Sequence, residues 1–246
     1  MLIQGLSRGA ISPLLLFFRR HIRFAAPALV CWLSACSSST PSSAVYASGY
    51  LADSGVVRLW RKDDTQQHLI TLVTALSPLQ GLDARITRYR FQQGALREVQ
   101  QTYSASASAS AHESASAREE IRLRFDQAGT VSYMQRQLPD RRESLSEDEI
   151  ALFQFDARRL LALSDSLRAG KVSLMQGRWN AGQVNTCDGQ TVRPDLDRAS
   201  LAWIAQRAER TAEPLNVAWL VSPEGTQLLQ VAEADFCRWE PTAEAW

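Results

Sequence analysis

The chain has 246 residues, of which 45% are hydrophobic and 22% are charged, so it has enough apolar content to bury a substantial core. Its 27 basic residues nearly balance its 26 acidic ones. The chain contains no run of Lys or Arg longer than two residues. This balance excludes the strongly basic surface that is typical of nucleic-acid-binding proteins.

The first 35 residues have the order of a bacterial signal peptide. An arginine cluster at residues 19–23 precedes an uncharged apolar run, FAAPALVCWLSA, at residues 24–35. A run of about a dozen apolar residues is too short for a transmembrane helix, which needs roughly 20. Residues 1–35 are therefore predicted to be a removable signal peptide. A second apolar patch at residues 11–18 indicates an over-extended translation start.

The apolar run ends in LSAC at residues 33–36, which resembles the lipobox read by lipoprotein signal peptidase. In such a motif the cysteine thiol accepts a diacylglyceryl group, so Cys36 is predicted to be the lipid-modified first residue of the mature protein. Several acyl chains, at about 0.8 kcal/mol per buried methylene, form a strong anchor. The alternative is an unmodified Cys36 with cleavage further on, near Ala44 or Ala47.

Residues 36–44, CSSSTPSSA, are predicted to be the lipid anchor and a flexible tether, because they contain too little apolar surface to fold. Ser37 follows the cysteine, and a non-acidic residue at this position is typical of lipoproteins that are transferred to the outer membrane. The expected location is the bacterial cell envelope, with the protein lipid-anchored at the outer membrane and facing the periplasm.

From Val45 onward the hydrophobic pattern mainly has a period of two, which predicts strands with one buried face. The clearest case is Ile121, Leu123 and Phe125, which alternate with arginines. Hairpin signals such as Gln92-Gln93-Gly94 predict antiparallel neighbours. Strands are predicted near residues 56–61, 67–74, 85–91, 96–102, 121–125, 130–138, 172–179, 217–221 and 227–231.

Two helices are predicted between these strands. Ser146 and Glu149 have the spacing of a capping box, and the following apolar stripe extends to about Gly170. A second helix is predicted from about Asp197 to Arg210. The fold class is therefore α+β, with one mainly antiparallel sheet, a meander of hairpins, packed with two helices. Residues 45–246 are expected to form a single periplasmic domain, interrupted by a disordered Ser/Ala loop at residues 104–117.

Cys187 and Cys237 are the two cysteines that follow Cys36. In an oxidising periplasm such a pair favours a structural disulfide, which contributes about 4 kcal/mol by closing a loop of this length. Two unpaired thiols are the alternative. A redox or metal role is less favoured, because no second Cys or His stands beside either residue at ligand spacing. No metal and no cofactor are predicted.

The sequence offers few candidates for catalysis. His68 lies in a strand pattern and has no partner nearby in the sequence, and His112 lies in the Ser/Ala tract. No hydrolase elbow, zinc-binding histidine pair, phosphate loop or dinucleotide-binding glycine pattern occurs. Helix capping and surface ion pairs explain the acidic residues of the first helix better than an acid/base pair does. These residues are Asp148, Glu149, Asp156 and Asp165.

Six tryptophans of the predicted domain could pack in the core or line an apolar pocket, and core packing is the favoured interpretation. They are Trp60, Trp179, Trp203, Trp219, Trp239 and Trp246.

Three long stretches resemble the enterobacterial YjaH family, a group of predicted lipoproteins of unknown function. They are ASGYLADSGVVRLWRKD from Ala47, MQRQLPDRRESLSEDEIALFQFDARRLLALSDSLRAGKV from Met134, and EGTQLLQVAEADFCRW from Glu224. The serine-alanine tract and the long leader depart from the family pattern. The resemblance implies no catalytic residue.

The predicted function is that of an uncharacterised envelope lipoprotein, a non-enzymatic binding or structural module tethered to the outer membrane. The membrane is its partner through the lipid anchor, and another envelope protein or a cell-wall component is the candidate ligand; nucleic acid is not expected. The alternatives are a carrier of lipid or another apolar ligand and, less favoured, an envelope hydrolase. A tryptophan-lined apolar cavity would favour the carrier, and a cleft containing a hydrogen-bonded His68 or carboxylate would favour the enzyme.

Overall fold

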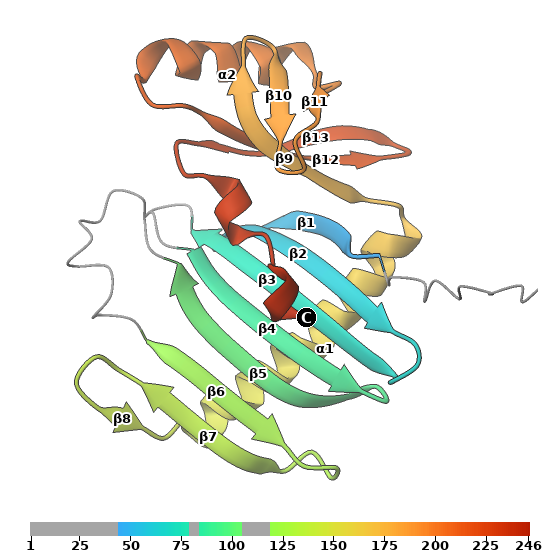
Figure 1. Ribbon diagram of the computed structural model, residues 1–246, viewed down its shortest axis with the longest axis vertical. Coiled ribbons are helices and arrows are strands. Elements are labelled where there is room, and N and C mark those ends of the chain that lie inside the picture. The colour runs from blue at the N-terminus through green and yellow to red at the C-terminus, as the bar shows by residue number, and fades with distance from the viewer. Residues whose placement is uncertain (1–43, 79–83, 105–118) are drawn as a thin grey trace, which may run out of the picture. The chain divides into compact units, whose positions relative to one another are not determined.

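The structure is a computed structural model that describes residues 44–78, 84–104 and 119–246. Eight antiparallel strands form the first sheet in chain order, so each strand pairs with the one before it (Figure 1). They are β1 (Tyr46–Ala52), β2 (Gly55–Asp64), β3 (Leu69–Pro78), β4 (Ala84–Gln92), β5 (Ala95–Ser104), β6 (Glu120–Phe125), β7 (Val131–Gln137) and β8 (Arg142–Glu143).

The tight connections of this sheet follow from its turn residues. Between β4 and β5, Gln93 and Gly94 both have positive φ, 52° and 78°. Two such residues match the twist of antiparallel strands in a two-residue hairpin. Asp126 Oδ1 accepts hydrogen bonds from the backbone N–H groups of Ala128 and Thr130, each at 2.9 Å, and so closes the turn between β6 and β7. The predicted meander of hairpins is confirmed.

The helix α1 (Glu147–Ala169) packs against one face of the first sheet, called the inner face here, and lies behind the sheet in Figure 1. The alternate residues of β6 that the sequence predicts to be inward lie in this core, which is completed by Ala157 and Leu160 of the helix. The alternating apolar residues of the strands and the apolar stripe of the helix therefore pack against each other in one core.

The second sheet has the strand order β11-β10-β9-β12-β13 and its own helix, α2 (Arg198–Arg210). Its strands are β9 (Ser173–Asn180), β10 (Gln183–Thr186), β11 (Thr191–Val192), β12 (Asn216–Ser222) and β13 (Gly225–Ala232). Val217 and Trp219 of β12 pack in the core that contains Ile204 of α2. Ala218 and Leu220 point the other way, into a core shared with the outer face of the first sheet.

The α+β class is confirmed, but the expectation of one sheet is wrong, because the strands divide between two sheets. The periodicity of a strand predicts which of its faces is buried, but it does not predict which other strands it pairs with. The predictions missed four strands, β1, β8, β10 and β11, which are short or rich in small and polar residues. Two 3-10 helices, η1 (Phe236–Trp239) and η2 (Ala243–Ala245), end the chain.

Several sequence-based predictions lie outside the described residues. They are the signal peptide at residues 1–35, Cys36 with almost the whole tether, and all of the Ser/Ala loop except Ser104. Within the part of the chain that the structure describes, no helix is both long enough and apolar enough to span a bilayer.

The capping box of α1 is confirmed. Ser146 Oγ accepts a hydrogen bond from the Glu149 backbone N–H at 3.3 Å, and Glu149 Oε2 accepts one from the Ser146 backbone N–H at 2.8 Å. Arg136 of β7 also donates to Glu149. The backbone hydrogen bond from Ser146, followed by the bond from Arg136, lowers the pKa of Glu149 to about 2.

We expect Glu149→Gln to weaken the dependence of the free energy of unfolding on pH below about pH 4.5. The folded-state pKa lies below the unfolded value of 4.5, so the carboxylate contributes stability above pH 4.5 that is lost as the pH falls toward about 2. Chemical denaturation between pH 2 and pH 7 measures this slope. Glu147→Gln, in the same helical turn but outside the capping box, is the control; an equal change of slope in both variants would contradict the assignment.

Candidate functional site

A disulfide joins the two cysteines that the sequence singled out. Cys187 follows β10 and Cys237 lies in η1, and their Sγ atoms are 2.05 Å apart across a sequence separation of 50 residues. The Cys187 backbone N–H donates to the carbonyl oxygen of Gln176 on β9 at 3.2 Å. The bond therefore attaches the C-terminal segment to the second sheet.

Next to this disulfide lies a buried arginine that the sequence analysis did not identify. Arg58 of β2 is fully buried. Its Nε donates to Gln176 Oε1 at 2.9 Å, its Nη1 donates to Ser77 Oγ at 3.0 Å, and its Nη2 donates to Gln230 Oε1 at 2.9 Å. Because Ser77 belongs to the first sheet and both glutamines to the second, Arg58 links the two sheets.

Two aromatic rings of η1 complete the surroundings of Arg58. Its guanidinium carbon lies 4.2 Å from the ring centroid of Phe236 and 4.9 Å from that of Trp239, which are cation–π distances. Burial lowers the pKa of Arg58 to about 9, so the side chain still carries its charge at neutral pH. Gln176 Nε2 also donates to Glu240 Oε1 at 2.8 Å, and burial raises the pKa of Glu240. We interpret this cluster as structural, because hydrogen bonds and packed rings surround the cation.

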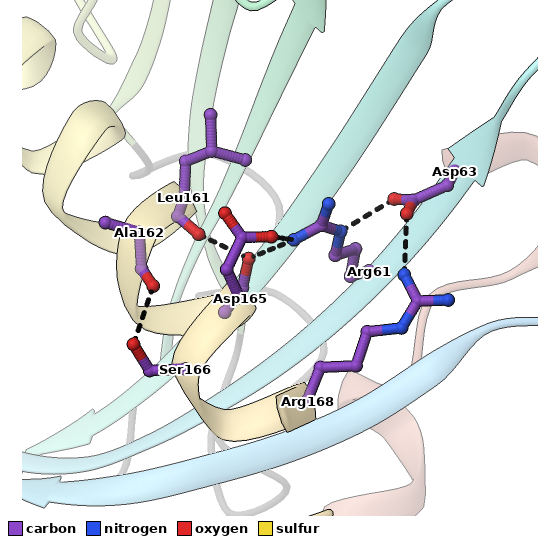
Figure 2. Close-up of polar contacts among 8 residues, drawn as sticks. Arg61, Asp63, Leu161, Ala162, Asp165, Ser166 and Arg168 are labelled. Atoms are coloured by element: carbon purple, nitrogen blue, oxygen red, sulfur yellow. Dashed lines mark hydrogen bonds and ion pairs between the residues drawn. The ribbon is translucent and has the colours of Figure 1, made fainter. Parts of the chain in front are cut away.

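A second buried arginine holds α1 to β2 (Figure 2). Arg61 Nε lies 2.6 Å from Asp63 Oδ1, and Arg61 Nη1 lies 2.5 Å from Asp165 Oδ1 and 2.8 Å from Ser164 Oγ. Arg168 Nη1 lies 2.7 Å from the other Asp63 oxygen. Two carboxylates thus balance two guanidinium groups, and the network fixes the C-terminal end of the helix against the sheet.

A groove of about 330 Å³ lies beside α1 over the inner face of the first sheet, and it is the candidate binding site. Buried polar side chains of three neighbouring strands line it: Thr74, Thr87 and Gln101. Thr87 Oγ1 donates to Gln101 Oε1 at 3.3 Å. Tyr50 and Tyr103, both partly buried, also line the groove. These groups can donate and accept hydrogen bonds, so the groove suits a polar ligand.

Charged side chains also line the groove, three of each sign: Arg85, Arg136, Arg159, Glu119, Glu149 and Asp156. Most are paired with one another. Arg136 lies 2.7 Å from Glu119 and also contacts Glu149, while Arg159 lies 3.4 Å from Asp156. The polar groups of the described lining are therefore hydroxyl, amide, carboxylate and guanidinium groups, with neither His nor Cys among them.

Three of the six tryptophans considered in the sequence analysis are buried, in agreement with the core packing that it favoured. Trp60 and Trp239 are buried in the core between the two sheets, and Trp219 is buried in the core between the second sheet and α2. Trp179 lines a second groove, of about 800 Å³ and wide open, beside α2. Trp203 is 45% exposed on α2, and Trp246 is partly buried at the C-terminus.

Of the residues considered for catalysis, Glu149 and Asp156 line the groove beside α1, whereas His68 is not among its lining residues. His68 is exposed in the turn between β2 and β3, with a φ of 49°, and not within a strand as its sequence pattern suggested. Glu149 caps α1 and Asp165 contacts Arg61 at the other end of the same helix. Within the described ranges, no group of three or more His, Cys, Asp or Glu side chains is arranged to hold a metal ion.

These features define an α+β domain of two antiparallel sheets that is closed by a disulfide and carries a polar groove beside its long helix. The chain belongs to a family described as protein of unknown function (DUF1481), whose model matches residues 47–242. It is 38% identical over 246 residues to a protein of Escherichia coli (strain K12) named "Uncharacterized protein YjaH", and this match covers 99% of the chain and 100% of that protein. The resemblance seen in the sequence is therefore confirmed. No solved structure matches the chain.

Proposed function

We propose that this protein is a cell-envelope lipoprotein, anchored to the outer membrane through Cys36, whose folded part is a non-enzymatic binding module. The disulfide between Cys187 and Cys237 is the observation that carries the proposal. Disulfides persist in oxidising compartments such as the periplasm and are rare in the cytosol. Export of the domain agrees with the signal-peptide pattern before LSAC at residues 33–36.

The groove beside α1 supports the binding part of the proposal. It offers tyrosine, threonine and glutamine side chains, and its charges are largely paired, so a neutral or weakly charged polar ligand fits it. Such a ligand could be a cell-wall component or a polar segment of another envelope protein. The open groove beside α2 favours the second candidate, a carrier of an apolar ligand, because its lining includes Leu196, Leu201 and Leu215.

Replacing Cys36 with serine is expected to abolish labelling by a palmitate analogue and to reduce recovery of the protein in the outer-membrane fraction. The thiol is the group that accepts the lipid, and serine lacks it. Cys31→Ser, which alters the other cysteine of the leader, is the matched control and is expected to leave both readouts unchanged. A Cys36→Ser protein that stays labelled and stays with the outer membrane would overturn the proposed anchor.

A further inference from the structure

The outer face of the first sheet, opposite α1, carries four arginines in a regular array. Arg88 and Arg90 lie on β4, and Arg122 and Arg124 lie on β6, with one residue of β5 between the members of each pair. Residues two apart on a strand are about 6.8 Å apart, and strands two apart are about 10 Å apart. These four side chains, called the arginine face, thus form a two-by-two array.

The arginine face carries an excess of positive charge. Glu98 lies 3.5 Å from Arg90 and 3.7 Å from Arg124, and Glu120 lies 2.7 Å from Arg122. Among the described residues, three of the four guanidinium groups therefore share two carboxylates, and the guanidinium of Arg88 donates instead to the Gln100 side chain and to the Ala245 carbonyl oxygen. Four positive charges against two negative ones indicate a surface that is complementary to anions.

The arginine face is accessible at β6 and has aromatic side chains at both ends. The side chains of Arg124 and Arg122 are 64% and 51% exposed. The ring of Tyr133, on β7, lies 5.7 Å from the guanidinium carbon of Arg124. At the β2 side, the ring of Trp246 lies 6.0 Å from the Lys62 ammonium. Tyr and Trp next to cationic side chains are typical of surfaces that contact the interfacial region of a membrane.

We propose that the arginine face docks the domain onto an anionic phospholipid surface. Guanidinium groups bind phosphate oxygens in bidentate fashion, and an array on a sheet face matches many neighbouring phosphates better than one small anion. The choice of a membrane rests on the proposed function. The nine residues from Cys36 to Ala44 span at most about 30 Å, so a lipid on Cys36 holds the domain beside a membrane.

The test measures how strongly phenylglyoxal modifies each arginine of the full chain when the protein is bound to vesicles. The chain is reconstituted into vesicles of phosphatidylcholine alone or with phosphatidylglycerol, treated with phenylglyoxal, and analysed by mass spectrometry. We expect modification of Arg122 and Arg124 to fall about tenfold or more in the anionic vesicles and to recover in high salt, which screens surface charge. Arg158 of α1 and Arg198 of α2, both exposed and away from the arginine face, serve as internal controls.

A double variant, Arg122→Gln with Arg124→Gln, is expected to abolish the protection of Arg90 in the anionic vesicles, whereas Arg158→Gln with Arg198→Gln leaves it intact. Equal modification in the two kinds of vesicle would overturn the proposal. Protection by isolated cell-wall sacculi but not by vesicles would also overturn it and would identify the wall as the partner. Palmitate labelling is measured separately, so a missing lipid anchor and an inactive arginine face give different results.

Discussion

Replacing Arg58 with alanine is expected to lower the free energy of unfolding by about 3–5 kcal/mol. The guanidinium is fully buried and donates to Gln176, Ser77 and Gln230. Its loss leaves the three side-chain oxygens without this hydrogen-bond donor. It also opens a cavity next to the ring of Phe236. Both effects act at the contact between the two sheets, where little solvent can enter to compensate.

Urea denaturation followed by circular dichroism measures this change. Arg158→Ala, at an exposed position on α1, is the matched control and is expected to change stability by no more than about 0.5 kcal/mol. Arg58→Met fills most of the space without donating hydrogen bonds, so it separates packing from polar pairing. An Arg58→Ala protein as stable as the Arg158→Ala protein would contradict the proposed link between the sheets.

Removing the disulfide is expected to cost about 4 kcal/mol, because the cross-link closes a loop of 50 residues in the unfolded chain. For a domain of about this size, the corresponding fall in the melting temperature is about 8–16 °C. The variant is Cys187→Ala with Cys237→Ala, and thermal unfolding by circular dichroism is the measurement.

Reduction provides the internal control for this variant. Dithiothreitol is expected to lower the melting temperature of the unaltered protein to that of the double variant and to leave the double variant unchanged. If dithiothreitol lowered the melting temperature of both proteins equally, its effect would not come from breaking the disulfide between Cys187 and Cys237. A double variant with an unaltered melting temperature would show that packing around Trp239 already holds the C-terminal segment in place.

Local features were predictable from the sequence because their causes are local. Ser146 and Glu149 cap α1 through bonds that span three residues, and Gln93-Gly94 turns the chain between two neighbouring strands. The alternation on β6 likewise marks a buried face without knowledge of what covers it. The pairing of Cys187 with Cys237 could be anticipated for a different reason, since a domain with two cysteines can form only one internal disulfide.

The buried arginines could not be predicted in the same way. Arg58 and Arg61 lie three residues apart in β2, and charged residues in a strand are ordinarily expected to face the solvent. They are buried because the second sheet covers one face of β2 and the C-terminal end of α1 covers the other. Burial of a charge depends on segments more than 100 residues away in the sequence, with hydrogen-bond separations of 118 residues for Arg58 and 104 for Arg61.

The sequence by itself determined the α+β class, the family, the approximate positions of both α-helices and of nine strands, and the cysteine pair, because periodicity, capping and composition act over short distances. The tertiary structure alone decided the division into two sheets, the burial of Arg58, the polar groove beside α1 and the array of the arginine face. Each of these depends on which strands become neighbours and on which part of a sheet a helix leaves uncovered, and only long-range packing specifies those choices.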